Sequence, residues 1–277
     1  MRLTPCYDGP PVLVVDGPVD DPSVPLLRQR QRLRDVLAGL DQAQWATESR
    51  CAGWSVQDVI AHLVGTNQFW AASMAAGLAG VPTRFLGSFD PVATPAEMVG
   101  GMRSLTPADV LARFVESNAA LAALVGDLDP DAWTVLAEAP PGHVPLHAVA
   151  LHALWDAWIH ERDVVLPLGL PAAEEPDEVA ACLMYVAGVG PAFSVSSHPG
   201  RRGLLAVEAT DPDLQLLVEA GPTVHVRSCA AAAGTPTLAG TAVDLVEALS
   251  FRAPLQHDLL DDARWMITGL GTVFDVA

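Results

Sequence analysis

The sequence predicts an α+β protein of two domains: a four-helix bundle over residues 23–170 and a smaller α+β domain over residues 171–277, after an extended arm over residues 1–22. Three observations predict this class. The chain has 277 residues, which is more than one typical domain. Four segments of the first part carry apolar residues at helical spacing. After Pro171 the pattern changes to short alternating segments separated by turn residues, which are typical of an antiparallel sheet.

The arm is rich in proline and holds one short apolar run, residues 12–15, that favours an extended conformation. The first helix is predicted over residues 24–40, where leucine and valine recur on one face and arginines occupy the other. The second is predicted to start at Ser55 and to run towards Gly77. Its first residues, Ser-Val-Gln-Asp, resemble a capping box with Asp58 in place of glutamate.

The two remaining bundle helices follow a long connection. Residues 78–106 are rich in Gly, Pro, Phe and Ser and predict a loop with a short helix near residues 95–100. The third helix is predicted from Pro107 to Gly126, with Thr106 as its N-cap. The fourth is predicted over residues 145–165, with a proline at its first turn. Four helices with one long crossover indicate a bundle.

The second domain is predicted from the spacing of its apolar residues and from its turn sequences. The segments in order are a helix over 176–188, strands over 203–210, 214–219 and 224–228, and a helix over 241–249. The separators between the strands, Asp-Pro-Asp and Gly-Pro, are turn sequences.

Composition excludes some classes of function. The net charge is −18, and all 15 basic residues are arginines, so a nucleic-acid partner is not expected. No apolar run has the length of a signal peptide or of a membrane span, so no membrane partner is expected. The four cysteines, Cys6, Cys51, Cys182 and Cys229, form no CxxC pair and are interpreted as buried thiols of a reduced cytoplasmic protein, with a catalytic cysteine as the alternative.

The segment that indicates chemistry is His152-Ala-Leu-Trp-Asp156-Ala-Trp-Ile-His160. On a helix its three polar residues form a stripe amid tryptophans, and a buried carboxylate there needs a partner. Asp156 and His160, four residues apart, can chelate one cation. His62, a polar residue in an apolar helical run, is the candidate third ligand. The alternative for His62 is a core histidine bonded to a carbonyl.

These residues carry a family resemblance. Residues 51–63, Cys-Ala-Gly-Trp-Ser-Val-Gln-Asp-Val-Ile-Ala-His-Leu, and residues 155–163, Trp-Asp-Ala-Trp-Ile-His-Glu-Arg-Asp, resemble the DinB-like metalloenzymes and, more narrowly, the mycothiol-dependent maleylpyruvate isomerase family. Residues 237–252 resemble the sterol-carrier-like C-terminal domain of that family. The similarity covers residues 24–277, so a DinB-like bundle and a sterol-carrier-like domain are expected.

The resemblance implies that His62, Asp156 and His160 hold a divalent metal, usually Zn²⁺. The family often has glutamate where this chain has Asp156. His152 is expected to act as a partner of a ligand, as a fourth ligand or as a proton carrier. Three ligands leave an open position on the metal, which in this family is taken by the thiol co-substrate, mycothiol.

Further site residues follow from the resemblance and from position. Arg252 matches a family arginine that faces the cleft and is expected to bind mycothiol or a substrate oxyanion, with a surface ion pair as the alternative. Asn67 and Gln68 are candidates for contacts to the sugars of mycothiol. Asp163 orients a ligand histidine or caps the helix end. The cleft is expected at the junction of the domains, with residues 78–106 setting substrate specificity.

The predicted function is a mycothiol-dependent metalloenzyme that activates the thiol as a metal-bound thiolate for S-transfer or thiol exchange on an electrophilic or S-conjugated small molecule, in a natural-product pathway. The alternatives are a cis-trans isomerase of the maleylpyruvate type, a zinc hydrolase that activates water, and a non-catalytic module. Mycothiol is an actinobacterial thiol, in keeping with the lysine-free composition of a high-GC gene. A monomer or a homodimer is expected.

Overall fold

The computed structural model describes residues 3–17 and 21–274, so the parts of the predicted arm at residues 1–2 and 18–20 lie outside the described residues. The helices are α1 (Ser23–Ala38), α2 (Gln42–Trp45), α3 (Val56–Leu78), α4 (Ala93–Gly100), α5 (Pro107–Val125), α6 (Leu146–Val165), α7 (Pro176–Ser197), α8 (Ala242–Leu249) and α9 (Asp261–Phe274), with 3-10 turns η1 (Phe85–Ser88) and η2 (Pro130–Thr134). The strands are β1 (Leu13–Asp16), β2 (Leu136–Ala139), β3 (Gly142–Pro145), β4 (Gly203–Thr210), β5 (Leu214–Ala220), β6 (Val224–Ser228) and β7 (Thr237–Thr241).

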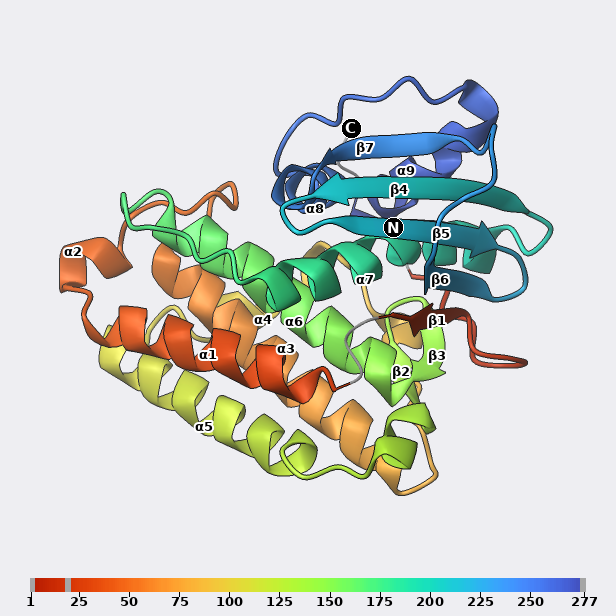
Figure 1. Ribbon diagram of the computed structural model, residues 1–277. Helices are drawn as coiled ribbons and strands as arrows, with labels where there is room; N and C mark the ends of the chain where they lie inside the picture. Colours follow the sequence, from red (N-terminus) through yellow and green to blue (C-terminus); the bar gives the residue numbers. More distant parts are fainter. Residues whose placement is uncertain (1–2, 18–20, 275–277) are drawn as a thin grey trace.

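Helices α1, α3, α5 and α6 form the predicted bundle (Figure 1). The capping box at the start of α3 and the N-cap Thr106 of α5 are confirmed. The Ser55 Oγ accepts from the Asp58 N–H at 3.2 Å, and the Asp58 carboxylate accepts from the Ser55 N–H at 3.0 Å. Thr106 and Asp109 form the same arrangement. Pro145 was predicted in the first turn of α6, but it is the N-cap and lies one position before the helix begins.

The connection after α3 contains the predicted short helix, α4, and is anchored by a carboxylate. Glu138 lies on β2, in an unpredicted hairpin with β3, and is completely buried. Its carboxylate accepts hydrogen bonds from the Tyr7 hydroxyl and the Thr83 hydroxyl, each at 2.6 Å, and from the Phe85 and Leu86 N–H groups, each at 2.8 Å. Four donors satisfy this buried charge and hold the connection in place.

Helix α7 is longer than predicted. Gly188 and Pro191 indicated an end near residue 188, but the helix continues through Pro191 to Ser197. Burial overrides the local breaker, because α7 packs between α6 and the sheet and also against α8 and α9 (Figure 1). By length and composition α7 could span a membrane, contrary to the prediction that no apolar run is long enough. Since 94% of its most apolar 18-residue stretch is buried inside the protein, α7 has the character of a core helix.

The second half contains a five-stranded sheet with the order β1-β6-β5-β4-β7. The antiparallel pairing of β4, β5 and β6 is confirmed. The edge strands are a correction to the prediction, because β1 pairs with β6 and β7 pairs with β4 in parallel, so the sheet is mixed. Residues 13–16 of the arm are therefore a strand of this sheet. Helix α9 was not predicted either.

One apolar core runs through both halves. It includes Leu26 of α1, Trp158 of α6, Tyr185 of α7 and Val226 of β6. A second cluster, around Phe114, fills the part of the bundle that lies away from the sheet. The two halves therefore share one core. Helix α7 lies in the middle of it, because it contacts α6 on one side and the sheet on the other.

The contact between α7 and α9 requires glycine. A Cβ added at Gly269 would lie 2.0 Å from the carbonyl oxygen of Gly190, which is backbone and cannot move away. We expect Gly269→Ala to lower the free energy of unfolding by about 1–3 kcal/mol, measured by denaturant titration. Gly100→Ala is the matched control, because a Cβ there meets no atom within 4 Å. Equal unfolding midpoints for the two variants would contradict this expectation.

Candidate metal centre

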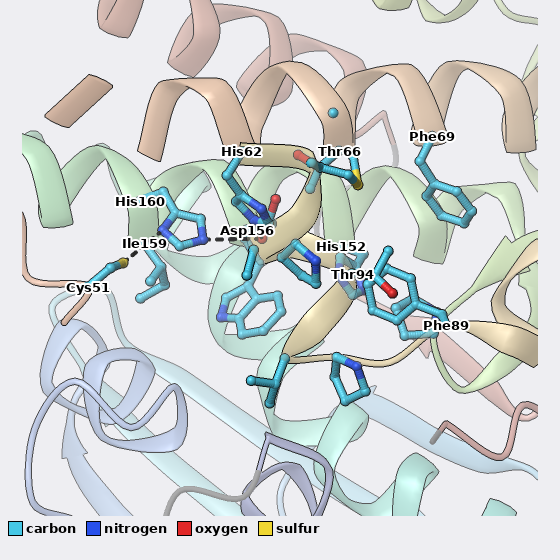
Figure 2. A pocket seen from close by; sticks show the side chains of 18 of the residues that line it. Cys51, His62, Thr66, Phe69, Phe89, Thr94, His152, Asp156, Ile159 and His160 are labelled. Carbon is cyan, nitrogen blue, oxygen red and sulfur yellow. Dashed lines mark hydrogen bonds and ion pairs between the residues drawn. The ribbon is translucent and has the colours of Figure 1, made fainter. Parts of the chain in front are cut away.

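Helices α3 and α6 bring His62, Asp156 and His160 together. The His160 Nε2 lies 3.6 Å from the Asp156 Oδ1, and the His62 Nε2 lies 3.9 Å from the same oxygen. One donor atom from each of the three residues lies within 4.8 Å of the others. Figure 2 shows the three side chains pointing toward one another. We refer to them as the triad. The spacing of Asp156 and His160 by one helical turn gives the pair, and α3 supplies the third donor.

The charge of the triad fits a cation. The Oδ2 of Asp156 is buried and has no hydrogen-bond partner among the described residues. Burial opposes ionisation of this carboxyl, but the neighbouring His62 and His160 hold its pKa below the ordinary value. Burial lowers the pKa of His62, which favours the neutral imidazole that binds metals. A buried carboxylate oxygen beside two imidazole nitrogens is a donor set that suits Zn²⁺ or a similar divalent metal.

The second nitrogen of His160 contacts Asp163. The Nδ1 lies 3.0 Å from the Asp163 Oδ2, so of the two roles considered for Asp163 the contact to a candidate ligand is the one observed. Burial disfavours the imidazolium, but the hydrogen bonds to Asp163 and Cys51 and the charge of Asp156 outweigh it and raise the pKa of His160 to about 10. A cation that binds the Nε2 therefore displaces a proton from this ring.

Arg252 follows α8 and binds the same carboxylate. Its Nε donates to the Asp163 Oδ1 and its Nη2 to the Asp163 Oδ2, each at 2.9 Å. The Asp163 side chain is completely buried, whereas that of Arg252 is 25% exposed. Arg252 also lines the cavity described below. The expected position in the cleft is thus observed. However, two of the guanidinium nitrogens already donate to Asp163, so Arg252 has fewer donors left for a substrate than we expected.

Cys51 also lies at this site, although no position there was predicted for it from the sequence. Its thiol donates to the Asp163 Oδ2 at 3.1 Å and lies 3.7 Å from the His160 Nδ1. The cysteines are not all buried as predicted, because Cys6 and Cys229 are exposed and Cys51 is half-buried. The signal for Cys51 was its place just before the Gly-Trp-Ser segment of the resembling motif.

His152 lines the cavity but is not part of the triad. Its Nδ1 shares a hydrogen bond with the Tyr185 hydroxyl, and its ring packs against Trp70 and Trp155 at centroid distances of 4.5 and 5.3 Å. Burial lowers the pKa of His152 to about 4. It is therefore a neutral ring near pH 7, and any proton that it carries is held only transiently.

The structure does not bring Asn67 and Gln68 to the cavity. Asn67 is buried, its side-chain oxygen accepts from Arg30 at 2.9 Å, and its amide donates to Asn118 at 2.7 Å. Gln68 is exposed on the other side of α3. The expectation that these two residues face the thiol sugars was based on their closeness to His62 in sequence. The helix period instead points Thr66 and Phe69 into the cavity.

A cavity of about 690 Å³ opens beside the triad. Its lining comes from α3, from α6, from the connection after α3, and from Ser250–Arg252 and Leu270 of the second half. The expected position at the junction of the two halves is therefore observed. The cavity has the size of a ligand site, and most of its lining is aliphatic or aromatic.

The fold and the site define a class of protein. It is a helical bundle in which His62 on one helix faces an Asp-x-x-x-His pair on another, joined to a mixed α/β half. The family model described as "Mycothiol maleylpyruvate isomerase N-terminal domain" matches residues 26–165. The chain belongs to this family.

Solved structures extend the likeness in fold. The mycothiol-dependent maleylpyruvate isomerase and a histidine-to-alanine mutant of it each superpose with a TM-score of 0.60 at 18% identity, over 85% of this chain and 90% of the other. The likeness covers more of the chain than the family model, so it includes much of the second half. No curated protein matches significantly.

Proposed function

We propose that this protein is a mycothiol-dependent metalloenzyme in which His62, Asp156 and His160 hold a divalent metal, most simply Zn²⁺. The observation that carries the proposal is the triad itself, at the wall of a 690 Å³ cavity, with a buried carboxylate oxygen that finds no partner in the described part of the chain. Membership of a family named for mycothiol supports the choice of thiol. The C-terminal half is proposed to be the sterol-carrier-like domain of that family.

The metal, when bound, lowers the pKa of a thiol and so favours the nucleophilic thiolate. The protein's own residues prepare the site for this. Asp163 fixes which nitrogen of His160 faces the triad, and Arg252 holds Asp163 in place. The mostly apolar lining offers water few polar partners, which disfavours hydrolysis of a reactive intermediate. His152, at the cavity wall, would accept and return a proton, with the neutral ring as its resting form.

The reaction begins with attack of the thiol sulfur on an electrophilic carbon. If the carbon belongs to a conjugated double bond, a C–S bond forms and the electron pair moves to the conjugated carbonyl. Rotation and loss of the thiolate as the enolate electron pair returns then give the isomer, whereas protonation of the α carbon with the C–S bond retained gives the S-conjugate. The family name supports isomerisation more directly than the S-transfer or thiol exchange in a natural-product pathway that we predicted from sequence. The site can begin either reaction in the same way.

The test is a calorimetric titration of the Zn²⁺-loaded protein with mycothiol. We expect binding of one mycothiol per chain, and binding at least tenfold weaker for S-methyl mycothiol, which keeps the sugars but blocks the sulfur. A protein with confirmed metal that binds neither compound would refute the proposal. Turnover of an ester or amide without any thiol would favour the hydrolase instead.

A further inference from the structure

We infer that the co-substrate of this site carries a neutral, apolar group about two helical turns away from its electrophilic carbon. The inference rests on the proposed function and adds the class of substrate. The part of the cavity that would bind this group is called the aromatic end and is formed by Phe69, Trp70, Phe85, Leu86 and Phe89.

The aromatic end is set apart from the triad along α3. Phe69 lies seven residues after His62, which is about 10 Å along a helix axis. The Phe69 and Trp70 rings pack edge to face at 4.7 Å, and Trp70 in turn contacts His152, one turn before Asp156. Figure 2 shows Phe69 and Phe89 on the side of His152 away from His160. A molecule whose electrophilic carbon lies at the triad therefore extends along this wall.

The opposite wall of the aromatic end is held rigidly. Ser73, one turn after Phe69, donates to the Glu138 carbonyl at 2.7 Å, and the Glu138 carboxylate binds the Phe85 and Leu86 N–H groups. These bonds fix Phe85 and Leu86 beside the same half of α3. The apolar surface is therefore part of the folded structure, and it suits an alkyl or aryl group by burial and ring packing.

The charges nearby favour a neutral group. The guanidinium among the described lining residues is that of Arg252, which lies at the triad end and is bonded to Asp163. Behind the aromatic end lies the Glu138 carboxylate, which repels anions. The Arg84 guanidinium beside Phe85 is exposed and is paired with Asp8 at 3.0 Å. A substrate with a carboxylate at that distance from its electrophilic carbon would place the charge against phenylalanines, where no cation lies among the described lining residues.

A binding experiment tests the aromatic end without any turnover. The neutral fluorophore N-phenyl-1-naphthylamine is titrated into the Zn²⁺-loaded protein. We expect saturable binding, displacement by dibutyl maleate, and no displacement by maleate at the same concentration. Phe89→Arg should weaken the binding of the fluorophore at least tenfold. Val81→Arg adds the same charge at a residue that is 72% exposed and outside the cavity lining, and should leave binding unchanged.

A rate experiment tests the same inference with mycothiol present. Dibutyl maleate and maleate share one double bond, but the butyl chains of the diester are long enough to reach towards the aromatic end and carry no charge. Each rate is divided by its uncatalysed rate with mycothiol. We expect the acceleration to be at least tenfold larger for the diester, with a smaller ratio in Phe89→Arg and the same ratio in Val81→Arg. If Phe89→Arg does not fold, the competition between diester and diacid in the unchanged protein decides alone.

The outcomes separate the two proposals. Mycothiol-dependent turnover that prefers maleate, or fluorophore that maleate displaces, overturns the neutral substrate and leaves the proposed function standing. Failure of mycothiol to bind refutes the proposed function, whereas the fluorophore competition still reports on the aromatic end. Absence of fluorophore binding also overturns the inference.

Discussion

Replacement of His160 by alanine is expected to abolish metal retention and to lower the mycothiol-dependent rate by more than about 100-fold. Loss of a residue that only orients a ligand typically costs 10–100-fold in metal affinity or activity, and loss of a ligand costs more. His160 is also the member of the triad that Asp163 holds from behind. The measurements are metal content by mass spectrometry and the initial rate with mycothiol.

The matched control for this variant is His198→Ala. His198 is exposed at the end of α7 and lies outside the cavity lining, so the same substitution there should leave metal content and rate unchanged. A His160→Ala protein that folds and still holds one metal per chain would exclude His160 as a ligand.

Asp163→Asn is expected to weaken Zn²⁺ binding by about 10–100-fold. The amide keeps the shape of the side chain but removes the charge that pairs with Arg252, and its NH₂ group would face a donor of either Arg252 or His160. The unfolding free energy should fall by about 1–3 kcal/mol, because a largely buried guanidinium loses its partner. Competition with a chromophoric chelator measures the affinity, and denaturant titration measures the stability.

For this prediction the control is Asp213→Asn, in the exposed turn between β4 and β5. It makes the same chemical change without a neighbouring cation among its described contacts. An unchanged zinc affinity in Asp163→Asn would mean that the contact to the Nδ1 of His160 does not orient the ring. Lower stability with unchanged affinity would assign Asp163 a structural role alone.

The sequence predicted the parts of the fold and site whose causes are local. The starts of α3 and α5 were predictable because a capping box needs only four consecutive residues. Asp156 and His160 were predictable as a pair for the same reason, since one helical turn brings them to one face. His62 was a harder case, and it was found because a polar side chain inside an apolar run needs a partner.

The parts that could not be predicted depend on contacts between distant segments. The pairing of β1 with β6 joins Leu13 to Val224, and nothing near residue 13 encodes that choice. The hydrogen-bond partners of Asn67 and Arg252 come from distant segments and could not be predicted from the residues beside them in sequence. Arg30 from α1 binds one and Asp163 from α6 binds the other. Closeness in sequence to a ligand was therefore a poor guide to a position in the cavity.

Strand β1 has a consequence for how this protein can be divided. A fragment that begins at residue 171, the boundary suggested by the sequence, would contain four strands of the sheet and lack the fifth. The backbone groups of β6 that now face β1 would become an open edge, which invites pairing with other chains. Any separate production of the C-terminal half thus needs residues 13–16 supplied, by a covalent permutation or as a peptide. The two halves are therefore one folding unit joined through β1.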